Sequence, residues 1–232
     1  MRYISHLIIC ILLSVPVMLH AQEKNKDWAQ LQRYDSANRV VKSWPASKRK
    51  VVFTGDSITD FWITFDSAYF REHPYIDRGI NAQTSGQMLV RFRNDVINLE
   101  PKAVVILAGT NDVAENNGPT SLETIAGNIA SMAELAKAHH IKVVICSVLP
   151  ATDFWWHKGL EPAGKIIRLN EMLNAYALKN KFSYVDYHTE MKDASNGLDK
   201  MYSDDGVHPT PVGYRKMEEI LERTLVRLVP VR

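Results

Sequence analysis

The chain has 232 residues, of which 46% are hydrophobic, enough for one sizeable globular domain. Its formal net charge of +2 argues against nucleic acid as a partner, because proteins that bind nucleic acid present a clustered basic face. The sequence holds no internal repeat, no low-complexity segment and no convincing linker, so we expect one domain.

The first 21 residues have the pattern of a secretory signal peptide. Arg2 supplies the positive start, Leu7–Leu19 is almost wholly apolar, and a small residue precedes the expected cleavage point. The apolar run is shorter than the roughly 20 residues of a membrane-spanning helix, although an uncleaved anchor helix is the alternative. We therefore expect a secreted or periplasmic protein whose mature chain is not stably inserted in a membrane. Cleavage would remove Cys10 and leave Cys146 alone, so no intrachain disulfide is expected.

Residues 22–232 are predicted to form one domain, beginning with a helix at about 23–43 that packs against the rest. Apolar strands follow, at Val51–Thr54, Tyr75–Arg78, Ala103–Ala108, Lys142–Ser147 and Ser183–Asp186. They alternate with amphipathic helices at Ser85–Leu99, Ser121–Ala138, Pro162–Asn180 and Pro211–Leu228. Such Val- and Ile-rich strands indicate a parallel sheet with helices on both faces, so we predict an α/β fold with five strands in the order 2-1-3-4-5.

Gly55, Asp56 and Ser57 directly follow the first predicted strand. Gly55 allows a tight turn, and Ser57 stands at the start of a short helix predicted to run to about Phe65. A hydroxyl at this turn projects from the carboxyl edge of the sheet, where parallel sheets bind ligands. The N–H groups of the turn face the same way and can bind an anion. Ser57 is therefore a candidate nucleophile, with helix capping as its alternative role.

Asn111 follows the third predicted strand, within Gly109-Thr110-Asn111-Asp112. Strands one and three are neighbours in the predicted order, so Asn111 is expected to lie near Ser57. Its side-chain amide can donate to the oxyanion that forms when a serine attacks an ester carbonyl, which is worth roughly 3 kcal/mol of the barrier. An Asx turn or a helix cap is the alternative role.

Asp205 and His208 lie in a loop before the last predicted helix. A turn there can bring the carboxylate to one ring nitrogen while the other nitrogen faces Ser57. His208 would then act as the base, with Asp205 fixing its tautomer. Asp204 is an adjacent rival for the carboxylate role. Histidine and cysteine show no metal-binding spacing anywhere in the sequence, so we predict no catalytic metal.

Together these motifs resemble those of the SGNH hydrolases, also called GDSL-type esterases. The family's Gly-Asp-Ser, Gly-x-Asn-Asp and Asp-x-x-His signatures match residues 55–57, 109–112 and 205–208. The resemblance spans roughly residues 51–228. It implies a flavodoxin-like three-layer α/β/α sandwich, and ester hydrolysis by a serine, histidine and aspartate triad without a cofactor.

The resemblance also implies an oxyanion hole with three donors: the Ser57 backbone N–H, the Asn111 side chain, and a glycine N–H after strand two. In this chain Ala82 stands where the family usually has that glycine. Alanine retains an N–H, so we place the third donor at Ala82, with Gly79 and Gly86 as alternative alignments. The methyl group is unfavourable if the backbone there needs a positive φ.

Trp155 and Trp156 lie in the loop after strand four, where a substrate wall would stand. Their faces suit sugar rings or an acyl chain, and ordinary loop packing is the alternative. We predict a serine esterase that cleaves short-chain carboxylic esters, with O-acetyl groups on carbohydrates as the preferred substrate class. A lysophospholipase or thioesterase using the same site, and a non-catalytic carbohydrate-binding protein, are the alternatives. No oligomeric state is predicted.

Overall fold

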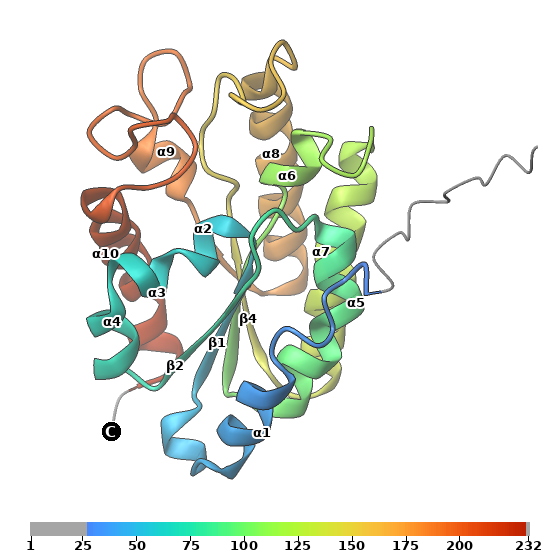
Figure 1. The fold of residues 1–232 in the computed structure, drawn as a ribbon, viewed down its shortest axis with the longest axis vertical. Coiled ribbons are helices and arrows are strands. Elements are labelled where there is room, and N and C mark those ends of the chain that lie inside the picture. Colours follow the sequence, from blue (N-terminus) through green and yellow to red (C-terminus); the bar gives the residue numbers. More distant parts are fainter. Residues whose placement is uncertain (1–26, 231–232) are drawn as a thin grey trace, which may run out of the picture.

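The computed structural model describes residues 27–230, which form a five-stranded parallel sheet between two layers of helices (Figure 1). The strands are β1 Val51–Gly55, β2 Tyr75–Gly79, β3 Ala103–Leu107, β4 Lys142–Cys146 and β5 Ser183–Val185. Their order is β2-β1-β3-β4-β5, which confirms the predicted α/β fold and strand order. Every residue of β1 and β3 is buried, as expected for central strands covered by helices on both faces.

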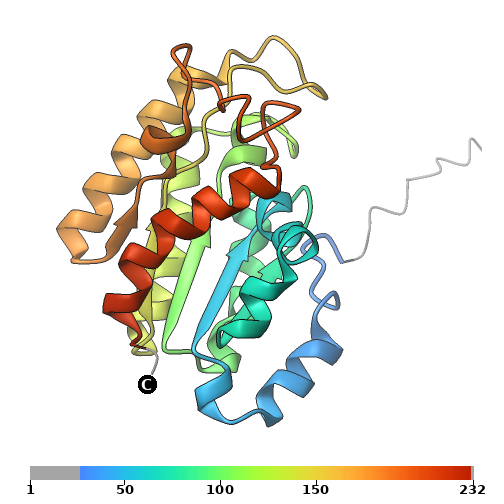
Figure 2. The same cartoon turned by 90° about the vertical axis from the view of Figure 1, so that its left-hand side faces the viewer.

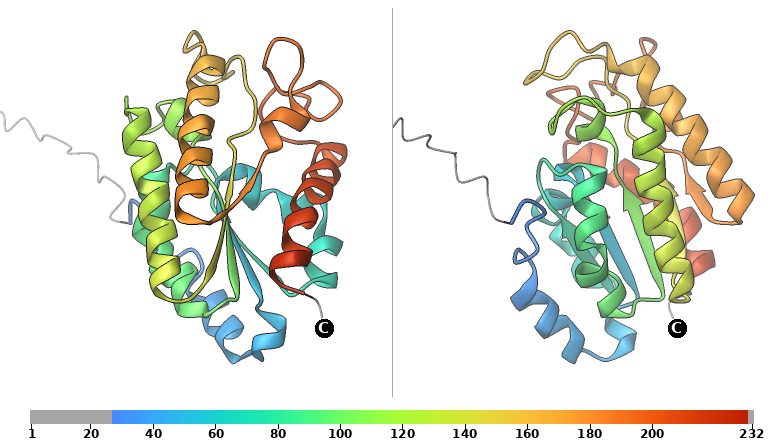
Figure 3. Two further views of the ribbon diagram at one scale, coloured as in Figure 1. Left: turned by 180° about the vertical axis from the view of Figure 1, so that it is seen from behind. Right: turned by 90° about the vertical axis from the view of Figure 1, so that its right-hand side faces the viewer.

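The longer helices divide between the two faces of the sheet. One face is covered by α5 (Ser85–Asp95), α7 (Leu122–Ala138) and α8 (Pro162–Asn180), seen from behind in Figure 3. The other face is covered by α3 (Trp62–Phe65), α4 (Ser67–Glu72) and α10 (Pro211–Leu228), and α10 crosses the sheet in Figure 2. The hydrophobic core is accordingly in two parts, one on each face. None of the described helices is long and apolar enough to cross a membrane.

Short helices follow three of the strands at their carboxyl ends. They are α2 (Ser57–Asp60) after β1, α6 (Thr110–Val113) after β3, and α9 (Tyr187–Met191) after β5. Figure 1 shows α2, α6 and α9 at the same end of the sheet. Because parallel strands bring their carboxyl ends together, the motifs at 55–57 and 109–112 meet at this edge.

The predicted helix at about 23–43 is wrong in extent. Its first residues, and the predicted signal peptide, lie outside the described residues, and α1 spans only Asp35–Ser43. The segment before α1 forms turns because the Asp27 carboxylate accepts the N–H groups of Leu31 (2.7 Å) and Gln32 (3.0 Å). A side-chain acceptor that satisfies these donors competes with helix formation. Gln30 also has a φ of 53°, which a right-handed helix does not allow.

Two other predicted helices are interrupted. The predicted helix Ser85–Leu99 is α5 followed by a separate 3₁₀ turn, η2 (Ile97–Leu99), because Val96 leaves the helical region with a φ of −124°. The short helix predicted from Ser57 to Phe65 is divided into α2 and α3 at Phe61. A further 3₁₀ turn, η1 (Ala46–Lys48), precedes β1.

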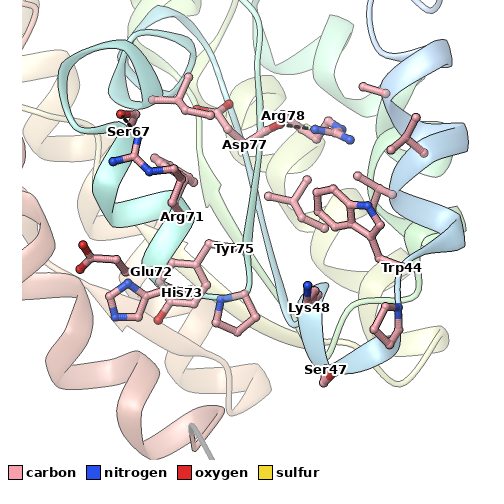
Figure 4. A pocket seen from close by; sticks show the side chains of 18 of the residues that line it. Trp44, Ser47, Lys48, Ser67, Arg71, Glu72, His73, Tyr75, Asp77 and Arg78 are labelled. Atoms are coloured by element: carbon pink, nitrogen blue, oxygen red, sulfur yellow. Dashed lines mark hydrogen bonds between the residues drawn. The ribbon is translucent and has the colours of Figure 1, made fainter.

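A groove of about 990 Å³ runs along the outer edge of β2, between α1 and α4 (Figure 4). The strand edge beside it is blocked by side chains. Arg78 donates to the Asp77 carbonyl (2.5 Å), the Asp77 carboxylate accepts the Gly79 N–H (2.7 Å), and the Tyr34 hydroxyl donates to the Gly79 carbonyl. Satisfying edge groups in this way protects an outer strand from pairing with another chain. The lining of this groove includes none of the predicted catalytic residues.

Candidate active site

Ser57 occupies the first turn of α2, directly beyond β1. The cap of this helix is Asp56, whose carboxylate accepts the Ile58 N–H at 3.0 Å. The Ser57 hydroxyl is therefore free of the capping role that was its alternative. Its Oγ lies 3.0 Å from Nε2 of His208. Burial raises the pKa of the Asp56 carboxyl to about 7, although the Ile58 N–H lowers it.

His208 is held by Asp205, and Asp204 is not its partner. Nδ1 of the ring lies 2.7 Å from Asp205 Oδ2. The other oxygen, Oδ1, accepts the N–H groups of Val207 (2.8 Å) and His208 (2.7 Å) and the Ser203 hydroxyl (3.2 Å). Burial by itself raises the pKa of Asp205, but the hydrogen bonds from the His208 ring and from these N–H groups outweigh it and hold the pKa below its ordinary value. The carboxylate is thus ionised at neutral pH.

The site offers two hydrogen-bond donors, the backbone N–H of Ser57 and the side-chain amide of Asn111. As the first residue of α2, Ser57 has a backbone N–H without an acceptor inside the helix. The Asn111 side chain donates through Nδ2 to the Gln83 carbonyl (3.1 Å) and accepts from Asn116 Nδ2 at Oδ1 (2.6 Å). An amide nitrogen carries two hydrogens, so one remains for an incoming oxyanion.

Aromatic side chains flank the His208 ring. The Trp156 ring centroid is 6.3 Å from that of His208, and Phe61 approaches it at 5.6 Å. Trp155 is 63% exposed and meets Trp156 edge to face, with 5.3 Å between their ring centroids. Trp62, next to Phe61, is buried in the core instead.

This arrangement can transfer an acyl group. It supplies a nucleophile, a base oriented by a carboxylate, and donors for a developing oxyanion. Within residues 27–230, no group of three or more His, Cys, Asp or Glu side chains is placed to hold a metal ion.

The sequence of this chain matches the model of one known protein family. The model of the GDSL-like lipase/acylhydrolase family matches residues 53–216, a stretch that contains all three predicted motifs. The chain belongs to this family. The predicted resemblance is thereby confirmed, and membership implies a hydrolase.

Related structures share the fold of this GDSL-family chain. A GDSL-like lipase from Bacteroides thetaiotaomicron is 45% identical, with a TM-score of 0.84, covering 87% of this chain and 100% of its own. A variant of an acetyl xylan esterase from Geobacillus stearothermophilus is 19% identical, with a TM-score of 0.58, covering 80% of this chain and 96% of its own. In sequence alone, an uncharacterized lipoprotein of Bacillus subtilis is 31% identical over 81 residues, so the match covers 34% of this chain and only 33% of that protein's length.

Ala82 lies where the family usually has glycine, and its φ is 63°. This is the left-handed region, in which a side chain is unfavourable. The neighbouring N–H groups are bonded within the protein, that of Asn81 to Asp60 Oδ2 (3.0 Å) and that of Gln83 to the Ile80 carbonyl (3.3 Å). Among the described residues no acceptor is found for the Ala82 N–H, which is therefore free to bind a ligand.

Ala82→Gly is expected to stabilise this GDSL-family protein by about 0.5 kcal/mol. Removing the strain of a left-handed alanine contributes about 1 kcal/mol, and the greater unfolded-state entropy of glycine offsets part of it. Turnover should stay within about twofold, because the backbone N–H remains. Urea unfolding measures the stability difference. Ala37→Gly, in the exposed face of α1, is the matched control and should destabilise by about 1 kcal/mol. If Ala82→Gly also lowered the stability, the proposed backbone strain at Ala82 would be contradicted.

Arg91, a buried side chain in α5, was not among the predicted site residues, although it forms hydrogen bonds to several segments around the site. Its guanidinium donates to the carbonyl oxygens of Gly55 (3.0 Å) and Arg78 (2.8 Å), to Gln83 Oε1 (2.5 Å) and to Asp95 Oδ2 (3.0 Å). It therefore links the carboxyl ends of β1 and β2 to the loop that holds Ala82. Its position among apolar residues of a predicted helix, four residues before Asp95, was the signal that could have found it.

Asp112 and the N-terminal segment hold the same loop from outside. The Asp112 carboxylate accepts the N–H (2.8 Å) and hydroxyl (2.6 Å) of Ser85, the first residue of α5. Gln83 Nε2 donates to the Ala29 carbonyl at 2.8 Å. Asp112, the last residue of the Gly-x-Asn-Asp motif, thus holds the start of α5 next to the loop that contains Ala82.

Proposed function

We propose that this chain is a secreted or periplasmic serine esterase that removes short acyl groups, with O-acetyl groups on carbohydrates as its preferred substrates. The observation that carries the proposal is the hydrogen-bonded line from Asp205 through His208 to Ser57, with separations of 2.7 and 3.0 Å. A serine is activated as a nucleophile when a base lies within hydrogen-bond distance and a third group orients that base.

In the proposed reaction, Ser57 Oγ attacks the ester carbonyl carbon while Nε2 of His208 takes its proton. The carbonyl oxygen becomes an oxyanion that accepts hydrogen bonds from the Ser57 and Ala82 N–H groups and from Asn111 Nδ2. The imidazolium, stabilised by Asp205, returns the proton to the leaving alcohol. Water then attacks the acyl-serine by the same route and releases the acid.

The surroundings of His208 support a short acyl group. The ring centroids of Phe61 and Trp156 lie 5.6 and 6.3 Å from that of His208, and we expect the two side chains to limit the space for an acyl chain beside this base. A long chain needs an apolar groove that begins at the serine, whereas the 990 Å³ groove along β2 has no triad residue in its lining. The exposed face of Trp155 offers a stacking surface for a sugar ring.

Purified mature protein should hydrolyse p-nitrophenyl acetate with a kcat/KM at least about tenfold higher than that for the octanoate, since each extra methylene must find room beside Phe61 and Trp156. It should also release acetate from acetylated xylooligosaccharides. Ser57→Ala supplies the blank for both assays. A preference for octanoate or for a lysophospholipid would overturn the proposed short-acyl substrate class, but the serine mechanism would still hold. Binding of glycans without turnover of any ester would overturn the esterase.

A further inference from the structure

A chain of hydrogen bonds connects the Trp156 loop to the oxyanion donor. Trp156 Nε1 donates to Asn116 Oδ1 (2.8 Å), Asn116 Nδ2 donates to Asn111 Oδ1 (2.6 Å), and Asn111 Nδ2 donates to the Gln83 carbonyl (3.1 Å). Trp156 follows β4, Gln83 follows β2, and the two asparagines follow β3, with Asn111 in α6 and Asn116 just after it. We call this chain of four groups the amide relay.

The two ends of the amide relay determine its direction. An indole N–H can only donate, and a backbone carbonyl can only accept. Both asparagine amides between them must therefore point the same way, with each oxygen toward Trp156 and each nitrogen toward Gln83. If the Asn111 amide were inverted, its oxygen would face the Gln83 carbonyl and an incoming oxyanion, and its NH₂ group would face the Asn116 NH₂ group. Three hydrogen bonds would then be unmade.

The Trp156 ring packs against a core residue on one side and lies near His208, the proposed base, on another. Its ring packs on Phe154, a fully buried residue, with centroids 5.1 Å apart, and lies 6.3 Å from the ring of His208. The next residue, His157, donates from Nδ1 to the Ala114 carbonyl at 2.8 Å, which fixes the loop against the segment after α6. These contacts hold the indole ring where its N–H reaches Asn116 Oδ1.

We propose that Trp156 and Asn116 are positioning residues, which set the orientation of the Asn111 amide so that its free hydrogen faces the oxyanion. The proposal rests on the proposed function, because it concerns the transition state of that reaction. An orientation of this kind acts on the transition state and leaves the binding of the ester unchanged. Loss of the amide relay should therefore appear in kcat and not in KM.

Trp156→Phe keeps an aromatic ring beside His208 and removes the N–H. It should lower kcat for p-nitrophenyl acetate by about fivefold with KM within about twofold, compared with about 100-fold for Asn111→Ala. In the Asn111→Ala background, Trp156→Phe should change kcat by less than about twofold, because the amide it orients is gone. Independent, multiplying losses would overturn the amide relay. Trp44→Phe, an exposed tryptophan of the β2 groove, is the matched control and should match wild type.

Two substitutions of Asn116 distinguish a role in orienting the Asn111 amide from a role in anchoring the Trp156 loop. In Asn116→Asp the carboxylate still accepts the Trp156 N–H, but its second oxygen meets Asn111 Oδ1 and favours the inverted amide. The amide relay therefore predicts a larger loss of kcat in Asn116→Asp than in Asn116→Ala, about 30-fold against about fivefold. A purely structural role predicts the reverse order, because aspartate retains the bond that holds the loop. Equal or reversed losses would overturn the proposal.

The same experiments distinguish a failure of the proposed esterase function from a failure of the amide relay. If wild type turns over no ester, the serine esterase fails before any variant is compared. If wild type is active and Ser57→Ala is not, the reaction stands and the order of the Asn116 variants decides the amide relay alone. Thermal unfolding of each variant shows whether a lower kcat reflects loss of fold.

Discussion

Ser57→Ala is expected to lower kcat for p-nitrophenyl acetate by about 10⁴-fold or more while the protein stays folded. The substitution removes the atom that attacks the ester and leaves the oxyanion donors and His208 in place. Any residual rate should come from water activated in the same site. Ser57 is 5% exposed and its capping neighbour Asp56 is untouched, so the first turn of α2 should persist.

The measurement compares initial rates and unfolding midpoints of wild type, Ser57→Ala and a matched control. Ser195→Ala suits as the control, because Ser195 is an exposed turn residue whose backbone N–H, not its side chain, bonds to Asp193. Its rate should equal that of wild type. Equal rates for Ser57→Ala and wild type would show that the ester is cleaved elsewhere or without catalysis, and the non-catalytic reading would then be favoured.

The triad was predictable because its geometry is mostly local or fixed by the sheet. Asp205 and His208 need only a turn to meet, and their contact is between residues three apart. Ser57 and Asn111 each follow a Val- and Ile-rich strand, and neighbouring parallel strands end at one edge. A short turn and one topological rule were therefore sufficient to predict that Asp205 meets His208 and that Ser57 and Asn111 lie at one edge of the sheet.

The supporting contacts were not predictable, since they depend on how side chains from distant segments are oriented. Trp156 and Asn116 are 40 residues apart, and no spacing rule relates them. The start of α1 was misplaced for a different reason: apolar spacing from Trp28 onward suggested a helix, but the Asp27 carboxylate satisfies the N–H groups that a helix would use. Local hydrogen bonding overrode the periodic pattern.

Ala82 shows what the sequence does and does not determine. Departure from the family glycine raised the question whether the backbone needs a positive φ, and the value of 63° answers it. The loop tolerates this strain because it is held at Gln83 by Arg91 and Ala29. A strained residue persists where its surroundings over-determine its conformation, which is common next to an active site.

Asp205→Asn is expected to lower kcat by about 10⁴-fold, and to be at least as damaging as Asp205→Ala. The reason lies in the orientation of the new amide. Asp205 Oδ1 accepts the backbone N–H groups of Val207 and His208, at 2.8 and 2.7 Å. An asparagine must place its oxygen there, because its NH₂ group would meet two donors. The NH₂ group therefore faces Nδ1 of His208.

A neutral His208 that accepts this NH₂ at Nδ1 must carry its proton on Nε2, the nitrogen that lies 3.0 Å from Ser57 Oγ. It can then no longer take the serine proton. Alanine imposes no tautomer, so Asp205→Ala should keep more activity. Asp204→Asn is the matched control and should match wild type, since among the described residues this exposed neighbour forms no hydrogen bond or ion pair with the ring. A greater loss in Asp204→Asn than in Asp205→Asn would mean that the wrong carboxylate has been assigned. If Asp205→Ala proved the weaker enzyme, tautomer control would be rejected, and imidazolium stabilisation would be the role of Asp205.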